Sequence, residues 1–177
     1  MPQTAFIFSD AGYQHTVPQG HPERPERLTA IREGFEQSGL NPPRIEAKPA
    51  TREDLLRVHT AAHIDLVEKT CATAAPYDDP DTYMTQGSWN AALVAAGGAI
   101  EACRQVHEGN YKSVFSATRP PGHHAEASHA MGFCLFNNVA IGALHARKNH
   151  GLRRIAVVDF DVHHGNGTEA AFRDDHG

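Results

Sequence analysis

The chain has 177 residues, 40% of them hydrophobic, which is enough for one domain with a sizeable core. Its formal net charge of −5 provides no basic surface for a phosphate backbone, so we expect no direct binding of nucleic acid. No apolar run approaches about 18 residues and the N-terminal stretch lacks the features of a secretory signal, so we expect a cytoplasmic protein that does not enter a membrane.

Predicted strands and helices alternate along the chain. Runs rich in β-branched and aromatic residues predict strands at residues 4–9, 45–47, 112–117 and 154–160. Apolar residues at helical spacing predict helices at residues 28–38, 51–58, 61–73, 88–106 and 137–149, and a short one that ends at Phe172. Residues 10–20 and 74–87 are expected to form loops. This alternation predicts one α/β domain built on a parallel sheet.

The helix predicted at residues 88–106 contains two consecutive glycines. Gly97 and Gly98 would cost about 2 kcal/mol relative to alanines in an exposed helix, so we expect close packing against a neighbour to offset this cost. Ser88 is the expected N-cap of this helix, and Asn166 or Thr168 the expected cap of the short last helix.

The run IAVVDFDVHHGNG at residues 155–167 joins a predicted buried strand to a cluster of polar side chains. Asp159, Asp161 and His163 alternate along it, so an extended chain would place all three on one face. One metal ion, with bonds of about 2.0–2.2 Å, fits between Asp161 and His163. The alternative interpretation is a hydrogen-bonded strand end, which is disfavoured because two carboxylates and an imidazole repel or cost heavily without a cation.

A second histidine pair follows the strand predicted at residues 112–117. The chain has 13 histidines, and His123–His124 and His163–His164 are adjacent pairs among them. The carboxyl ends of parallel strands meet at one edge of a sheet, so adjacent strands would bring the two pairs together. His123–His124 alone could be a surface or structural pair, and the combination favours a metal or proton-transfer site. Cys71, Cys103 and Cys134 share no CxxC spacing, and we expect them to be reduced.

Four motifs, in this order, carry a resemblance to a known family. They are HPERPERL (21–28), RPPGHHAE (119–126), GFCLFNN (132–138) and VVDFDVHHGNGTE (157–169). Together they resemble the histone deacetylase superfamily, on its class II side, with bacterial histone-deacetylase-like amidohydrolases and acetylpolyamine amidohydrolases. The resemblance implies a three-layer α/β/α fold of the arginase/deacetylase type. It also implies a Zn²⁺-dependent amidohydrolase that removes an acetyl group from a lysine side chain or a related small amine.

The resemblance assigns roles to six polar residues. Asp161 and His163 would be zinc ligands, with Asp159 behind them, and His123 and His124 would flank the attacking water. In the family the partner of the first histidine is an acid that matches Asp159, and the partner of the second matches Asn166. A carboxylate favours imidazolium and a neutral amide does not, so we expect His124 to be the general base and His123 its cationic partner.

Further residues match the family's substrate site. Gly132 and Phe133 match the wall of the acyl-lysine tunnel, although without the neighbouring motifs an aromatic in the core would be the preferred interpretation of Phe133. Arg27 matches an arginine at the inner end of the tunnel, and its alternative is a solvated residue at a helix start. Asp81 falls in a loop where some relatives grip substrate, but the match slips there by a residue or more. The resemblance also implies a structural K⁺ ion near the carbonyls of residues 159–163.

The chain departs from the family pattern after residue 167. Family members supply a third zinc ligand, an Asp, and a transition-state Tyr from later loops, whereas this sequence ends at Gly177. We therefore expect residues 1–177 to be the N-terminal part of a single deacetylase-like catalytic domain, truncated, and inactive and poorly folded when taken alone.

Two other interpretations remain open. One is a non-catalytic fragment or pseudoenzyme that keeps an acyl-lysine binding surface, and the other is a different metallohydrolase in which His123 or His124 ligates the ion directly. The expected partners are an acetylated lysine protein or peptide, an acetylpolyamine or another small amide. Assembly into a homo-oligomer is left open.

Overall fold

The computed structural model describes residues 3–174, so the first two and last three residues of the predicted domain lie outside the described part. Three parallel strands form its sheet: β1 (Thr4–Phe8), β2 (Arg44–Ile45) and β3 (Ser113–Ala117). Their order is β2-β1-β3, and β1 pairs with β3 from Thr4 opposite Ser113 to Phe8 opposite Ala117. The predicted α/β architecture with a mainly parallel sheet is confirmed.

The described chain contains seven helices. They are α1 (Ala11–Gln14), α2 (Glu26–Ser38), α3 (Arg52–Leu55), α4 (Ala61–Thr73), α5 (Ser88–His107), α6 (Asn138–His150) and α7 (Asn166–Phe172). The prediction of an uninterrupted loop at residues 10–20 was wrong, because α1 forms one turn there with its first two residues buried. None of the helices within residues 3–174 is both long and apolar enough to cross a membrane.

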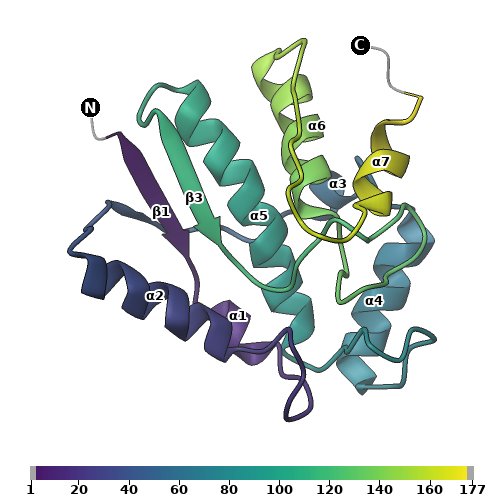
Figure 1. Cartoon of the computed structure of the whole chain (residues 1–177). Coiled ribbons are helices and arrows are strands. Elements are labelled where there is room, and N and C mark those ends of the chain that lie inside the picture. The colour runs from purple at the N-terminus through teal and green to yellow at the C-terminus, as the bar shows by residue number, and fades with distance from the viewer. Residues whose placement is uncertain (1–2, 175–177) are drawn as a thin grey trace.

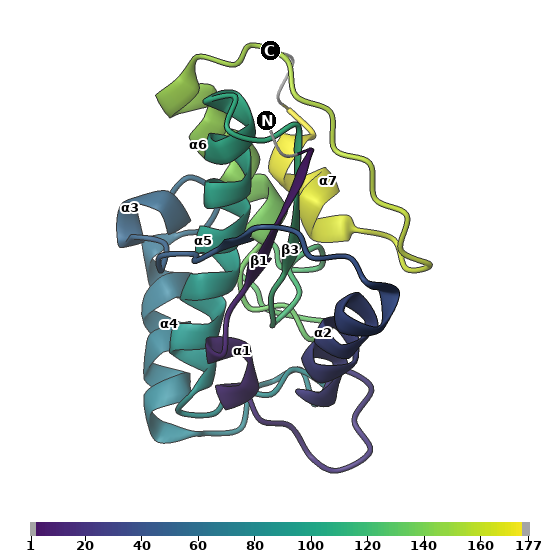
Figure 2. The same ribbon diagram turned by 90° about the vertical axis from the view of Figure 1, so that its left-hand side faces the viewer.

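Alternating side chains of β1 pack on opposite layers of helix. Phe6 packs with Leu28 and Phe35 of α2, whereas Ile7 packs with Val94 of α5 on the other face. Figure 2 shows the sheet edge-on between α2 and α5, and Figure 1 shows α6 beside α5 and farther from the strands. A separate apolar cluster, centred on Phe136 and Leu135, joins the far side of α5 to α4 and α6. The apolar core is therefore divided into three clusters, one on each face of β1 and one between α4, α5 and α6.

The two glycines of α5 are sites of close backbone approach. A Cβ on Gly97 would overlap the backbone carbonyl oxygen of Lys48, and one on Gly98 would lie 2.9 Å from the Ser116 hydroxyl on β3. A side chain at Gly97 would push α5 away from the backbone at Lys48, and one at Gly98 would crowd Ser116 of β3. The predicted close packing is confirmed.

The caps of α5 and α7 differ from those expected, and α2 and α6 end at left-handed glycines. Asn137 caps α6 by accepting a hydrogen bond from the Ala140 N–H, and the left-handed Gly39 and Gly151 end α2 and α6. Ser88 is not the cap of α5, since Gly87 holds that position and the Ser88 hydroxyl bonds His15 instead. Gly165 precedes α7 without a side-chain cap, so the expectation for Asn166 or Thr168 was also wrong.

The strand predicted at residues 154–160 does not form in the described chain. The segment is extended, but no backbone of the described residues lies beside it to complete a β-ladder. Figure 2 shows it as a bare trace along the outside of the molecule between α6 and α7. Ile155 and Val157 face a hollow against α6 and α7, whereas Val158, Phe160 and Val162 are 82%, 97% and 92% exposed. The prediction of a buried strand was therefore wrong for the described chain, because a strand needs a neighbouring strand for its hydrogen bonds and this segment has none there.

Candidate active site

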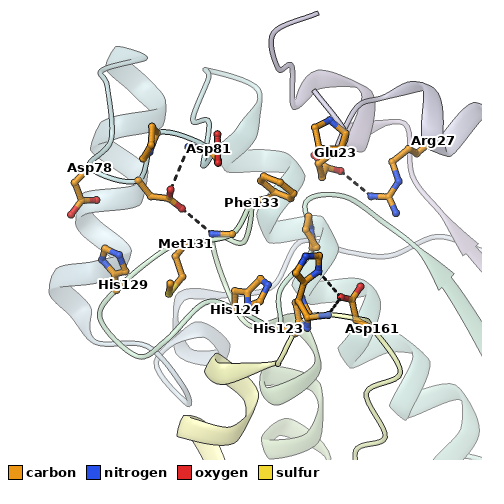
Figure 3. Close-up of a pocket in the computed structure, with 16 residues that line it drawn as sticks. Glu23, Arg27, Asp78, Asp81, His123, His124, His129, Met131, Phe133 and Asp161 are labelled. Carbon is orange, nitrogen blue, oxygen red and sulfur yellow. Dashed lines mark hydrogen bonds and ion pairs between the residues drawn. The ribbon is translucent and has the colours of Figure 1, made fainter. Parts of the chain in front are cut away.

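One pocket of about 830 Å³ gathers most of the predicted site residues (Figure 3). Its walls come from the loop before α2, the 78–81 loop, the segments 121–133 and the 161–163 stretch. The lining residues are Pro22, Glu23, Arg27, Asp78, Asp79, Pro80, Asp81, Pro121, His123, His124, His129, Met131, Gly132, Phe133, Asp161 and His163. Segments far apart in the sequence therefore converge on one cavity, as expected for loops that follow the strands of a parallel sheet.

The tandem histidines lie side by side, and each is held from behind by a different partner. Their ring centroids are 4.0 Å apart. The Nδ1 atom of His123 lies 2.9 Å from Oδ2 of Asp159, and the Nδ1 atom of His124 lies 2.7 Å from Oδ1 of Asn166. The residue pairing predicted from the motifs is thus found in the structure. We expected two adjacent strands to bring these residues together. Instead, the segment 154–163 places Asp159 beside His123 without pairing with the sheet.

Asp159 is stabilised as a carboxylate. Its Oδ1 accepts a hydrogen bond from the Asp161 N–H, and its Oδ2 bonds His123. These contacts hold the pKa of Asp159 below its usual value, the Asp161 N–H having the larger effect. An ionised Asp159 can only accept this hydrogen bond, so Nδ1 of His123 must carry a proton. In the neutral ring Nε2 is then the unprotonated nitrogen.

The two predicted metal ligands are close together and solvent-accessible. Oδ1 of Asp161 lies 2.9 Å from Nδ1 of His163 and accepts the His163 backbone N–H at 2.8 Å. The backbone bond, followed by the bond to the His163 ring, lowers the pKa of Asp161. A carboxylate and an imidazole suit zinc, but a catalytic zinc takes three protein ligands. Within residues 3–174 no three His, Cys, Asp or Glu side chains are arranged to hold an ion. The residues present fit part of a zinc site.

Gly132 and Phe133 form a turn with left-handed backbone, with φ angles of 56° and 69°. A Cβ on Gly132 would overlap the His124 ring, so only glycine allows this approach. Phe133 is a non-glycine residue in the same region, which costs energy unless its surroundings hold it. Its ring and that of His21 form a T-shaped contact with a centroid distance of 4.7 Å. Both residues that the resemblance assigns to the tunnel therefore line the pocket, and Gly132 lies directly against the His124 ring.

Two side chains hold this turn that sequence reasoning missed. Asp79 Oδ2 accepts the Gly132 N–H at 2.9 Å, and Thr82 Oγ1 accepts the Phe133 N–H at 3.0 Å. Thr82 in turn donates to Asp79 Oδ2 at 2.6 Å. We call Asp79 and Thr82 the turn clamp. Burial would raise the pKa of Asp79, but the bonds from Thr82 and Gly132 outweigh it and lower the pKa. The DxxT spacing is compatible with a local turn, but nothing in it indicates residues 132 and 133.

Asp81 and Arg27 both reach the pocket but do not bind one another. Asp81 and Asp78 are both exposed, and Figure 3 shows these acids across the cavity from Arg27. Nη1 of Arg27 lies 3.8 Å from Oε1 of Glu23. The predicted locations of these two residues are consistent with the pocket, and their roles stay predictions.

A buried ion pair under the pocket was also missed. Glu23 and Arg119 are 1% and 3% exposed and form two charge-assisted hydrogen bonds of 2.5 and 2.6 Å. The Arg119 guanidinium also donates to the carbonyls of Gly12 and His15. Burial opposes ionisation of Glu23, but the bonds from His15 and Arg119 lower its pKa to about 2. Because Arg119 begins the loop that carries both histidines, this pair fixes the base of that loop.

A known protein family matches most of this chain. The family described as "Histone deacetylase domain" matches residues 21–177. The chain belongs to the histone deacetylase family. Histone deacetylase 15 of Arabidopsis thaliana is 44% identical over 157 residues, which cover 87% of this chain and 28% of that protein. A probable deacetylase of Methanothermobacter thermautotrophicus is 43% identical over 154 residues, which cover 87% of this chain and 46% of that protein.

Other histone deacetylase family proteins extend the comparison. The human polyamine deacetylase HDAC10 is 40% identical over 168 residues, covering 89% of this chain and 25% of HDAC10. The crystal structure of the HDA15 HD domain superposes with a TM-score of 0.92 at 40% identity, over 99% of this chain and 52% of that structure. The chain thus spans about a quarter to a half of the length of these histone deacetylase relatives.

Proposed function

We propose that this chain contributes to a zinc-dependent amidohydrolase that removes an acetyl group from the side-chain amine of lysine or from a related small amine. The observation that carries the proposal is the tandem pair His123–His124, whose Nδ1 atoms bond a carboxylate and an amide respectively, beside the donors Asp161 and His163. Membership of the histone deacetylase family supports it.

The two histidines have different tasks in this proposal. His124 takes a proton from the attacking water and later returns one to the leaving amine, because its amide partner does not favour a permanent positive charge. His123, paired with ionised Asp159, is the cationic neighbour that stabilises negative charge as it develops on the acyl oxygen. Their different partners separate the roles.

Asp161 and His163 would hold the zinc, together with a donor beyond the described pair. Zinc, when bound, supplies an activated water and polarises the amide carbonyl. In the proposal the 177-residue chain alone is inactive, because the described residues supply only two such donors at this site.

The pocket favours a substrate that carries positive charge. Asp78, Asp79 and Asp81 lie on one rim, and the negative charge of Glu23 is already balanced by Arg119. An acidic rim attracts cations by long-range electrostatics. Lysine-rich peptides and acetylpolyamines both meet this description, and relatives include proteins named histone deacetylase and polyamine deacetylase.

The test compares this chain with the product of the full open reading frame that encodes it. Acetate release is measured with an acetyl-lysine peptide and an acetylpolyamine, with added zinc and with a chelator. We expect chelator-sensitive turnover by the full product, none by the chain alone, and a loss of about 10² to 10⁴ in kcat on His124→Ala. His164→Gln, which alters an exposed histidine paired with Glu169, is the control and should keep full activity. Activity that survives the chelator or the His124→Ala change would refute the proposal.

The alternative is a non-catalytic fragment that keeps an acyl-lysine binding surface. The shaped Gly132–Phe133 wall favours it, since this wall forms without a complete metal site. Calorimetric binding of an acetyl-lysine peptide, with no acetate released by either protein, would favour this alternative over the enzyme.

A further inference from the structure

The orientation of the Asn166 amide is determined by three acceptors. Its Nδ2 lies 2.8 Å from Oε1 of Glu126, 3.3 Å from the His124 carbonyl oxygen and 3.4 Å from Sδ of Met131. None of these atoms can donate a hydrogen bond, so the amide nitrogen must face them. A flipped amide would place its oxygen against the Glu126 carboxylate. The Oδ1 atom is thereby forced toward His124.

This orientation fixes the tautomer of His124. Because Oδ1 of Asn166 can only accept, the Nδ1 atom of His124, 2.7 Å away, must carry the ring proton. In the neutral imidazole Nε2 is then the atom with the lone pair. No described residue hydrogen-bonds Nε2, which leaves it available to a ligand in the pocket.

Glu126 is itself held in place by its backbone. Its N–H donates to the His129 carbonyl at 2.9 Å, and its carbonyl accepts from Nδ1 of buried His59 at 2.9 Å. These anchors do not involve the carboxylate. These backbone hydrogen bonds should therefore keep the side chain at position 126 directed at Asn166 when its terminal group is changed.

We infer that Glu126 is a positioning residue that sets the tautomer of His124 through the Asn166 amide. A carboxylate in direct contact with imidazole, as at His123, both orients the ring and favours its positive charge. At His124 the amide lies between the two groups, so Glu126 orients the ring without forming an ion pair with it. The role in catalysis rests on the proposed function, since a general base needs its lone pair on the nitrogen that faces the substrate.

The test reads the tautomer directly, without requiring activity. Two-bond proton–nitrogen spectra of the ¹⁵N-labelled chain at alkaline pH distinguish protonated from unprotonated ring nitrogens, and His124→Gln assigns the His124 signals. We expect one tautomer in the unchanged chain, with the proton on Nδ1. In Glu126→Gln the new amide can turn and donate, so the ratio of Nδ1–H to Nε2–H should fall about tenfold, which corresponds to about 1.4 kcal/mol. Glu126→Lys, which can only donate, should lower the ratio further.

Two controls separate positioning from general damage. His123 is oriented by Asp159, so its tautomer should be unchanged in every Glu126 variant. Glu169→Gln removes a nearby exposed carboxylate that bonds His164 and Arg173, and it should leave His124 unchanged. A His124 tautomer that is the same in both Glu126 variants, or that carries its proton on Nε2 in the unchanged chain, overturns the inference. If the Glu126 variants shift the His124 tautomer as expected but the full product releases no acetate, only the proposed function is contradicted.

Discussion

Phe133 keeps an unfavourable backbone conformation because its N–H is held. The Thr82 hydroxyl accepts this bond and donates one to Asp79, so it links the two residues of the turn clamp. Thr82→Val keeps the size of the side chain but leaves the Phe133 N–H without its acceptor, at a cost of about 1–3 kcal/mol. We expect hydrogen exchange at the Phe133 amide to become at least about tenfold faster, as followed by NMR.

Thr85→Val is the matched control for this change. Thr85 bonds Ser88 and Thr16 and does not contact the turn. It should leave exchange at Gly132 and Phe133 unchanged. Equal exchange rates in Thr82→Val and the unchanged chain would show that the clamp does not hold the turn.

His59 makes stability depend on pH. Burial, with a smaller effect from nearby His63, lowers the pKa of His59 from 6.5 to about 3. Between these values the unfolded chain binds more protons than the folded one, so the unfolding free energy decreases as pH decreases. The loss begins below about pH 6.5 and is at most about 1.4 kcal/mol per pH unit from this residue. The lowered pKa of His63 adds in the same direction.

Urea unfolding at pH 8, 7, 6 and 5 measures this dependence. The lowered pKa of Glu23 acts in a more acidic range, between 4.5 and about 2, and does not confuse the result. His59→Gln can accept from the Asn137 N–H and donate to the Glu126 carbonyl, as His59 does, but cannot be protonated. It should make the decrease in unfolding free energy between pH 7 and 5 shallower, with the contribution of His63 remaining. An equally steep decrease in this variant would assign the effect to other groups.

At the scale of the element, glycines in two helices should respond oppositely to the same substitution. Gly34 in α2 is exposed with open space around its Cβ position, so Gly34→Ala should raise the unfolding free energy by up to about 1 kcal/mol. Gly97→Ala in α5 meets the Lys48 carbonyl and should lower it by about 1–3 kcal/mol. Urea midpoints compare the two, and a stabilised Gly97→Ala would contradict the close packing described above.

Local signals predicted most of the elements because their causes are local. The apolar spacing of α4 and α5 and the left-handed glycines after α2 and α6 all lie within the segments that they define. The strand at residues 154–160 could not be judged in this way, since a strand depends on a partner elsewhere in the chain. α1 was missed because one turn carries too little periodic pattern to detect.

The candidate site was predictable where the family resemblance pairs residues of two motifs. His123 and His124, with Asp159 and Asn166, lie within the motifs that indicated them. Glu126 also lies in one of these motifs, but the resemblance gave it no partner, and its contact with Asn166 depends on how an amide is oriented. Asp79, Thr82 and Glu23 act over 50 or more residues through backbone groups or a buried arginine, which residue type alone does not reveal.

At the scale of the whole molecule, one apolar stripe is exposed to solvent. Val158, Phe160 and Val162 lie on the outer face of the extended segment, whose backbone forms no ladder with the described strands. Contiguous exposed apolar surface promotes association. We therefore expect the unchanged chain to bind a hydrophobic dye and to gain mass with concentration in light scattering, and Phe160→Gln to reduce both.

The unfolding free energy should stay within about 0.5 kcal/mol in this variant, because Phe160 is 97% exposed. Leu66→Gln on α4 changes a single exposed leucine away from the stripe and is the control. Equal dye binding by Phe160→Gln and the unchanged chain would show that the stripe does not drive association.

The same extended segment makes the histidine pair vulnerable to a protease. Arg153 and Arg154 are exposed in backbone that is neither helical nor paired, so trypsin should cut there first. A single cut separates His123 and His124 from Asp159 and Asn166, which lie on the smaller piece. The pieces still share bonds from the Thr168 N–H to the His123 carbonyl and from Asn137 to the Thr168 hydroxyl. The site is therefore built from two parts of the chain, and the segment that contains Arg153 and Arg154 joins them covalently.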